Sequence, residues 1–351
     1  MPGSPASSER DQNGDVRIGL ALPQYDYSVP GDSPLSFETI VEHARRAEAA
    51  GYDSLWLSDH LVLDLARYGG RPDSEFAFEP LATLGALATQ VTGPRLGTLV
   101  LCEALRPPAV AAKALATLDR LCGGRLDVGL GAGWYQPDYD ALGMAMPTPG
   151  ARVRRLREAT AIITGLLGGE RLELQGEFLS VFGAEVDPPA VQRPRPPVFI
   201  GGKGDRVIAA AVELADGWNT CWAWTPDAYR ERLAVMERAC DAAGRDPATM
   251  WRSLGLYALV GEDEADLAAR FERLRASAPP GVLEVSLDEW RVGHLVGTVE
   301  QVREQAAEWE GLGIETLILG PGAVPFHVGA LDDLDALGEA LAPFRSASAQ
   351  G

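Results

Sequence analysis

One stretch of the chain, from Leu96 to Trp134, most constrains its fold, because it has the pattern of two strands joined by a helix. Leu96–Leu101 and Leu126–Leu130 are short apolar runs, as expected of strands buried on both faces of a parallel sheet. The helix between them is predicted to begin at Pro107-Pro108 and to end at Gly123-Gly124. The stretch therefore predicts a βαβ unit.

The same alternation of apolar runs and helical stretches continues along the chain, and alternation of this kind predicts a parallel sheet. We count eight strands, and 351 residues suit a single (β/α)8 TIM barrel with insertions. Residues 170–197 are predicted to form an inserted hairpin with an extended return, and residues 276–294 either a second insertion or a lid. The expected strands are 18–22, 54–58, 96–101, 126–130, 198–200, 217–219, 254–260 and 316–319.

The barrel is expected to span residues 16–345, between a disordered tail at 1–15 and a short tail at 346–351. The formal charge of −19 argues against a general binder of nucleic acid or anionic membranes. No apolar run is long enough for a membrane span, and the first residues lack the apolar core of a signal peptide. The four cysteines form no CxxC pair. We therefore expect a cytoplasmic protein.

Active-site groups of this fold follow the C-terminal ends of the strands. Those positions are rich in glycine and aromatic residues here. They contain no histidine and carboxylate cluster of the kind a metal site needs, and no nucleophile beside a base. We therefore expect no metal site and a cofactor that supplies the difficult chemical step.

The succession of the motifs GT-x-V, RPP, LDRLCGGR and GLGAGW resembles the luciferase-like monooxygenase superfamily, and within it the branch that uses the deazaflavin coenzyme F-420. The resemblance covers residues 16–345. It implies an oxidoreductase that transfers a hydride between F-420 and a small organic substrate, and a homodimer. The alternatives are an FMN-dependent monooxygenase with a partner flavin reductase and, from another class, a catalytically silent flavin-binding protein.

Asp59 and His60, at the end of the second expected strand, are the polar pair that most strongly indicates catalysis. An acid and an imidazole in this place can bind a ring or relay a proton near neutral pH. In the resembled branch, the Asp contacts the coenzyme ring and the His takes part in catalysis. The alternative is a helix-capping Asp and a structural His. His294 and His327 lie in loops that could approach the same mouth.

The motif GT-x-V corresponds to a family feature, a non-prolyl cis peptide that backs the coenzyme ring. By position we expect this peptide at Leu99-Val100, with Thr98 beside it. An ordinary buried strand is the alternative.

Gly131, Ala132 and Gly133 are expected to border the coenzyme, because glycine lets a flat ligand lie against bare backbone. Family members that oxidise a sugar phosphate carry a Glu immediately after this motif. Trp134 stands there instead, which speaks against that activity. We expect Trp134 to stack on the substrate or to shape the pocket, with core filling as the alternative.

The run Gly201, Gly202, Lys203, Gly204 follows the fifth expected strand and opens a helix. Exposed amides and a helix N-terminus favour an anionic group. The resemblance makes this run a contact to the ribityl-phosphate side of the coenzyme. Thr220, at the end of the next strand, could add a hydroxyl contact. A plain tight turn is the alternative for the glycine run.

Overall fold

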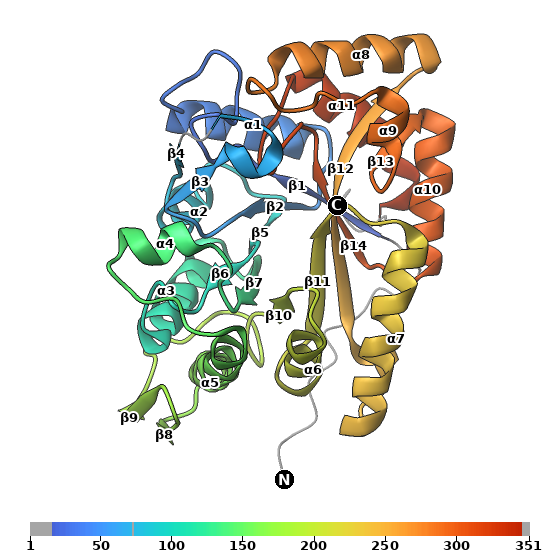
Figure 1. Ribbon diagram of the computed structural model, residues 1–351. Helices are drawn as coiled ribbons and strands as arrows, with labels where there is room; N and C mark the ends of the chain where they lie inside the picture. The colour runs from blue at the N-terminus through green and yellow to red at the C-terminus, as the bar shows by residue number, and fades with distance from the viewer. Residues whose placement is uncertain (1–15, 72–73, 346–351) are drawn as a thin grey trace.

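The computed structural model describes residues 16–71 and 74–345, so both expected tails lie outside the described residues. Eight parallel strands form a closed barrel, which confirms the predicted fold (Figure 1). The sheet order is β10-β11-β12-β14-β1-β2-β5-β7, and β7 pairs with β10 to close it. The barrel strands are β1 (Arg17–Ala21), β2 (Ser54–Leu57), β5 (Arg95–Thr98), β7 (Leu126–Gly131), β10 (Val198–Gly201), β11 (Gly217–Trp222), β12 (Trp251–Gly261) and β14 (Thr316–Gly320).

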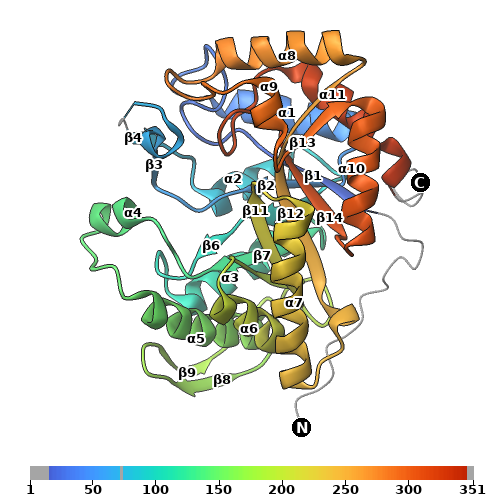
Figure 2. The same ribbon diagram turned by 45° about the vertical axis from the view of Figure 1, so that its right-hand side comes forward.

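Helices surround the barrel on its outer side, as Figures 1 and 2 show. Their ends follow the expected chemistry, since Ser36 caps α1 by accepting a hydrogen bond from the Thr39 amide, and α3 begins at Pro108. The helices of this layer are α1 (Phe37–Ala49), α2 (Pro80–Leu87), α3 (Pro108–Leu121), α5 (Pro149–Leu167), α6 (Asp205–Leu214), α7 (Pro226–Ala243), α10 (Val299–Gly311) and α11 (Leu331–Ala340).

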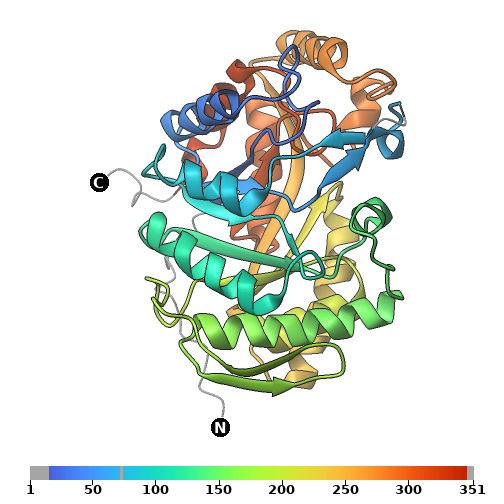
Figure 3. The ribbon, with the colours of Figure 1, turned by 90° about the vertical axis from the view of Figure 1, so that its left-hand side faces the viewer.

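Several smaller elements interrupt the barrel. The antiparallel pair β8 (Leu172–Gln175) and β9 (Ser180–Ala184) confirms the hairpin predicted within 170–197, and it lies beside α5 (Figure 3). A second hairpin, made of β3 (Val62–Asp64), η1 (Leu65–Tyr68) and β4 (Ser74–Phe76), was not predicted. The remaining elements are α4 (Gln136–Ala141), η2 (Pro247–Thr249), α8 (Glu264–Ser277), α9 (Leu287–Arg291), β13 (Leu295–Thr298) and η3 (Ala342–Phe344).

Two expected strands differ from those in the structure. The predicted strand 96–101 is wrong as a single element, because β5 ends at Thr98 and a separate β6 covers Leu101–Cys102. The predicted strand 254–260 is part of a longer one. β12 pairs with β14 over Ser253–Tyr257 and then with the unpredicted β13 over Ala258–Gly261, so its last residues leave the barrel.

Large aromatic side chains fill the middle of the barrel. The Phe199 ring lies 5.7 Å from that of Trp56 and 5.1 Å from that of Trp251, measured between centroids. Glycine on the neighbouring strands makes this possible, since a Cβ atom on Gly97 would overlap the Trp56 ring and one on Gly19 would lie 2.5 Å from its Nε1 atom. Alternating large and small residues is the usual way a barrel of this size is filled. This aromatic layer closes the barrel below the ends of the strands.

Candidate active site

Above the aromatic layer, the ends of three strands meet around Val100. A Cβ atom built on Gly131 would lie 2.6 Å from Val100 Cγ2, and one on Gly201 would lie 2.9 Å from Val100 Cγ1. The two glycines and Val100 therefore form one surface, which we call the glycine cradle. Any side chain on either glycine would displace Val100. The structure thus brings together three predicted site residues: Gly131 at the end of β7, Gly201 at the end of β10, and Val100 in the link between β5 and β6.

The peptide bond between Leu99 and Val100 is cis, as expected from the resemblance. A second non-prolyl cis peptide, between Cys221 and Trp222, was not predicted. The Thr98 hydroxyl group donates to the Gly129 carbonyl group (3.0 Å) and accepts from the Gly129 amide (2.8 Å). The side chain of Thr98 therefore joins β5 to β7, which leaves only its backbone for the predicted coenzyme contact.

Asp59 is held by an ion pair that the sequence did not reveal. The Arg106 guanidinium group donates to both of its carboxylate oxygens, at 2.6 and 2.9 Å, and the Cys102 amide donates to one of them at 2.8 Å. Asp59 is buried, and Arg106 also contacts Glu79. The pair fixes the end of β2 against β6. Contact between Asp59 and a coenzyme ring remains a prediction.

His60 has a buried carboxylate as its partner. Its Nδ1 atom lies 2.7 Å from Oδ2 of Asp138, and the Leu61 amide donates to the other oxygen of Asp138 at 2.9 Å. Within the described residues no hydrogen bond is formed by His60 Nε2. Asp138 lies on α4 and was missed by the sequence analysis; its only signal was an acidic residue in the short stretch QPDYD after the glycine motif. The site therefore contains a His–Asp pair.

Trp134 and Tyr135 pack beside this pair. The His60 ring lies edge-on to both, with centroids 5.4 Å from Trp134 and 5.5 Å from Tyr135. The Arg67 guanidinium group lies 4.4 Å from the Trp134 ring centre, and the Tyr135 hydroxyl accepts from the Asp64 amide. Trp134 is exposed, so core filling is wrong as its role. Ala132 and Gly133 precede it, and Gly133 has a positive φ of 68°.

A buried acid lies next to the cradle on the side of α5. Glu103 follows β6, and its amide donates to the Gly131 carbonyl group. The Arg155 Nε atom donates to one carboxylate oxygen at 2.7 Å, and the other oxygen has no hydrogen-bond partner in the part of the chain that the structure describes. Burial raises the pKa of Glu103 to about 7, although the neighbouring Arg155 charge acts to lower it. This acid changes protonation state near neutral pH.

The glycine run after β10 lies beside the outer face of β11. The Trp218 indole donates to the Gly202 carbonyl group at 2.7 Å, and Lys203 Nζ lies 4.7 Å from the Trp224 ring centre. Gly204 is the N-cap of α6 and its turn leaves open space around it. The Thr220 hydroxyl group is buried and has no hydrogen-bond partner within the described residues. The predicted run and Thr220 thus belong to neighbouring strand ends.

The two loop histidines differ in position. His294 Nδ1 lies 2.5 Å from the Trp290 carbonyl oxygen, and its ring lies edge-on to Tyr257 of β12, 5.0 Å between centroids. It also lines a cavity of about 440 Å³ together with Trp224. His327 is completely buried, and burial lowers its pKa to about 4. His294 therefore approaches the mouth of the barrel, and His327 belongs to the core.

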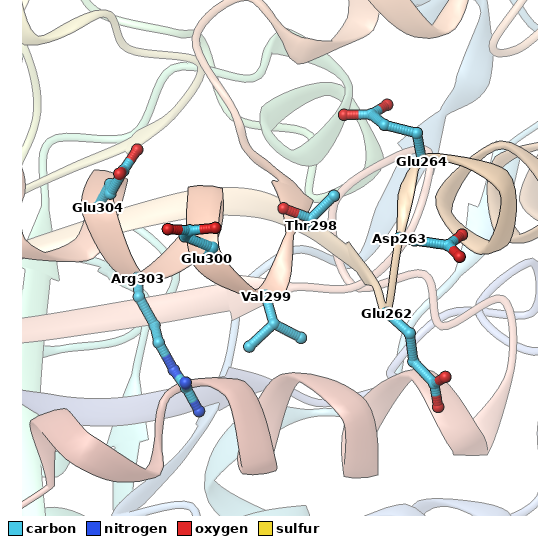
Figure 4. Close-up of a pocket in the computed structure, with 8 residues that line it drawn as sticks. All are labelled: Glu262, Asp263, Glu264, Thr298, Val299, Glu300, Arg303 and Glu304. Atoms are coloured by element: carbon cyan, nitrogen blue, oxygen red, sulfur yellow. The ribbon is translucent and has the colours of Figure 1, made fainter.

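A larger open groove, of about 770 Å³, lies at the ends of β12 and β13. Figure 4 shows that its acidic side chains point in different directions and do not converge on one point. Within the described residues no group of three or more His, Cys, Asp or Glu side chains is arranged to hold a metal ion. The lining residues are Glu262, Asp263, Glu264, Thr298, Val299, Glu300, Arg303 and Glu304.

Comparison with known proteins shows the family to which this chain belongs. The family model described as luciferase-like monooxygenase matches residues 18–316. The chain belongs to the luciferase-like monooxygenase family. Over 308 residues it is 30% identical to the F-420-dependent hydroxymycolic acid dehydrogenase of Mycobacterium tuberculosis, which covers 82% of this chain and 78% of that protein.

A further relative is also named as F-420-dependent. An F-420-dependent glucose-6-phosphate dehydrogenase from Microbacterium testaceum is 34% identical over 57% of each chain, so this chain matches little more than half of that relative. The fold is shared with an F-420-dependent secondary alcohol dehydrogenase solved with an F-420–acetone adduct. The TM-score is 0.75 at 20% identity, over 95% of this chain and 100% of that one. The two dehydrogenases found by sequence similarity confirm the branch expected from the sequence.

Outside the site, the described helices contain none that is both long enough and apolar enough to cross a bilayer.

Proposed function

We propose that this protein is an oxidoreductase that uses coenzyme F-420 to transfer a hydride to or from a small organic substrate. The observation that carries the proposal is the His60–Asp138 pair at the same strand ends as the glycine cradle. The names of its relatives support F-420 over FMN and an enzyme over a silent binder. Homodimerisation and a cytoplasmic location remain predictions.

The residues present fit a flat tricyclic ring. Because Gly131 and Gly201 have no side chain, Val100 packs directly against both, and the three residues form a compact apolar surface that a Cβ atom on either glycine would disrupt. When bound there, F-420 supplies a ring carbon that gives or takes a hydride. The amides of the turn 202–204 and the charge of Lys203 suit its phosphate, and the unpartnered Thr220 hydroxyl offers a further hydrogen bond.

His60 is the residue that handles the proton. A carboxylate only accepts hydrogen bonds, so the contact with Asp138 places the proton of neutral His60 on Nδ1. Nε2 then keeps its lone pair and can accept the hydroxyl proton of an alcohol. In the opposite direction, protonated His60 donates from Nε2 to a carbonyl oxygen. Asp138 acts through His60 and is a positioning residue.

Trp134 contributes shape rather than acid–base chemistry, because an indole has only a donor N–H group and no titratable proton near neutral pH. Asp59, whose two oxygens are bound by Arg106, holds the strand end that carries His60. The proton transfer is thus assigned to His60 alone. The glycine cradle by itself suits FMN equally well, so the choice between the coenzymes rests on the relatives.

The experiment is turnover by purified protein with F-420 and a panel of secondary alcohols, aldehydes and activated alkenes. His60→Gln is expected to lower kcat roughly 100-fold or more while F-420 still binds, because general acid–base catalysis contributes about that much. Asp140→Asn on the exposed face of α4 is the matched control. Full turnover by His60→Gln would contradict the assignment.

A further inference from the structure

Exposed apolar side chains gather around His60. The described residues contain ten large hydrophobic side chains that are exposed, and four of these belong to three segments that flank the His60–Asp138 pair. Isolated exposed hydrophobic residues are normal on a protein surface, whereas a contiguous group marks a binding site. We call these four residues the apolar rim: Leu61 (37% exposed), Phe76 (66%), Trp134 (44%) and Leu142 (45%).

Backbone contacts connect the rim residues to the catalytic pair. The Leu61 amide donates to Asp138, and the Leu61 carbonyl group accepts from the Ala77 amide, next to Phe76. Leu142 ends α4 one turn beyond Asp138, whose carbonyl group accepts from the Leu142 amide. In Figure 2 the β3–β4 hairpin and α4 project from the same side of the barrel. The apolar rim is therefore built on the same few backbone segments as the proton-transfer site.

A group of aromatic rings packs together in one cluster of the core, and within it Tyr25, Tyr27, Tyr257 and Phe326 are buried while Trp222 is half-buried. Tyr25 stacks on Tyr27 with centroids 5.0 Å apart, Trp222 stacks on Tyr257 at 5.4 Å, and Phe326 lies edge-on to Trp222 at 5.6 Å. The hydroxyl groups of Tyr25 and Tyr27 are already hydrogen-bonded within the protein. Of these rings, the half-buried Trp222 is therefore the one that offers a ligand apolar surface.

We propose that the substrate is a hydrophobic alcohol or ketone whose aliphatic chain lies over the apolar rim. This inference rests on the proposed function, because it places the reacting carbon within reach of His60 Nε2. In the oxidation, the alcohol carbon loses a hydride to oxidised F-420, its hydroxyl proton passes to His60, and a carbonyl bond forms. The apolar rim, on the segments that flank His60, is the surface to which we assign a chain attached to that carbon.

The test measures binding and turnover separately. Calorimetric titrations of the protein with methyl ketones, from acetone to methyl undecyl ketone, give affinity against chain length without any reaction. Each added methylene is expected to tighten binding roughly two- to four-fold, as apolar burial predicts. In Phe76→Ser and Leu142→Ser, the affinity should rise less steeply with chain length. Phe182→Ser, at a still more exposed position on the β8–β9 hairpin, should leave this dependence unchanged.

Reduction of the same ketones by reduced F-420 separates the two proposals. Graded binding without reduction of any ketone supports the rim as a chain-binding surface and contradicts the proposed function. Reduction with an affinity that is independent of chain length overturns the rim proposal and leaves the function intact. If Phe76→Ser and Leu142→Ser change the molar mass of the protein in solution and not ketone binding, the rim is a subunit interface and the proposal is wrong.

Discussion

His60 and Asp138 lie 78 residues apart in the sequence, yet Nδ1 of the histidine is 2.7 Å from a carboxylate oxygen of the aspartate. The carboxylate is buried, and its other oxygen accepts from the Leu61 amide. One side chain thus fixes both the imidazole and the backbone that follows it. This pair is the centre of the proposed chemistry.

Replacing Asp138 by Asn removes the acceptor that holds the proton of His60 on Nδ1. The amide can donate to Nδ1 instead, which favours the tautomer with its proton on Nε2. We expect kcat to fall roughly 100-fold, the lower range for losing a general base, with KM nearly unchanged. Steady-state kinetics with Asp140→Asn as control measure this. Unchanged kcat in Asp138→Asn would show that the contact is only structural.

Arg106→Leu is expected to destabilise the fold, because it leaves the buried Asp59 carboxylate without its counter-charge. Breaking a buried pair in this way costs about 3 kcal/mol of unfolding free energy, measured by urea denaturation. Arg154→Leu breaks the exposed pair with Glu177 and should cost much less, because solvent screens exposed ion pairs. If Arg106→Leu and Arg154→Leu lowered the free energy of unfolding equally, an unpaired buried Asp59 would cost no more than an unpaired exposed carboxylate.

The glycine cradle makes a steric prediction. In Gly131→Ala the new Cβ atom would lie 2.6 Å from Val100 Cγ2, so Val100 must move into the space assigned to the coenzyme. We expect F-420 affinity to fall roughly tenfold or more, the size of a modest overpacking cost. Gly311→Ala, where a Cβ atom meets nothing within 4 Å, is the control. Equal F-420 affinities would place the coenzyme elsewhere.

Glu103 makes a prediction about pH. Its pKa rises from the model-compound value of 4.5 to about 7 on folding, so the folded state binds more protons between these values. The stability that this group contributes is present below pH 4.5 and is lost as the pH rises through 7. Relative to Glu103→Gln, the natural protein should lose about 3 kcal/mol of unfolding free energy between pH 4.5 and pH 7.

Urea denaturation at several pH values measures this difference. The control is Glu177→Gln, because Arg154 lowers the pKa of Glu177 and reverses the sign of its effect. A constant difference between the natural protein and Glu103→Gln across the range would contradict the raised pKa.

The barrel could be predicted because its signals are local. Apolar runs bounded by glycine and proline located the eight strands, and the helix predicted between Pro107-Pro108 and Gly123-Gly124 is α3 (Pro108–Leu121). The insertions were harder. The short β13 directly follows the irregular segment 276–294, and no local sequence signal indicated it. It pairs with the part of β12 that extends beyond the barrel.

The site was predicted only in part, for a different reason. The cradle residues follow strand ends, so the fold alone brings Val100, Gly131 and Gly201 together. The partners of Asp59 and His60 come from other elements, and no spacing in the sequence indicates them. Arg106 entered the sequence analysis only as the first residue of the RPP motif, and Asp138 lies on a helix too short to predict. Pairings of this kind are fixed by tertiary packing.

The most direct test of this account is a titration of the purified apoprotein with F-420 and, separately, with FMN, following coenzyme fluorescence and stoichiometry. The account predicts tight binding of one F-420 per chain and much weaker binding of FMN, with F-420 binding reduced in Gly131→Ala. Preference for FMN, or no binding of either coenzyme, would contradict it.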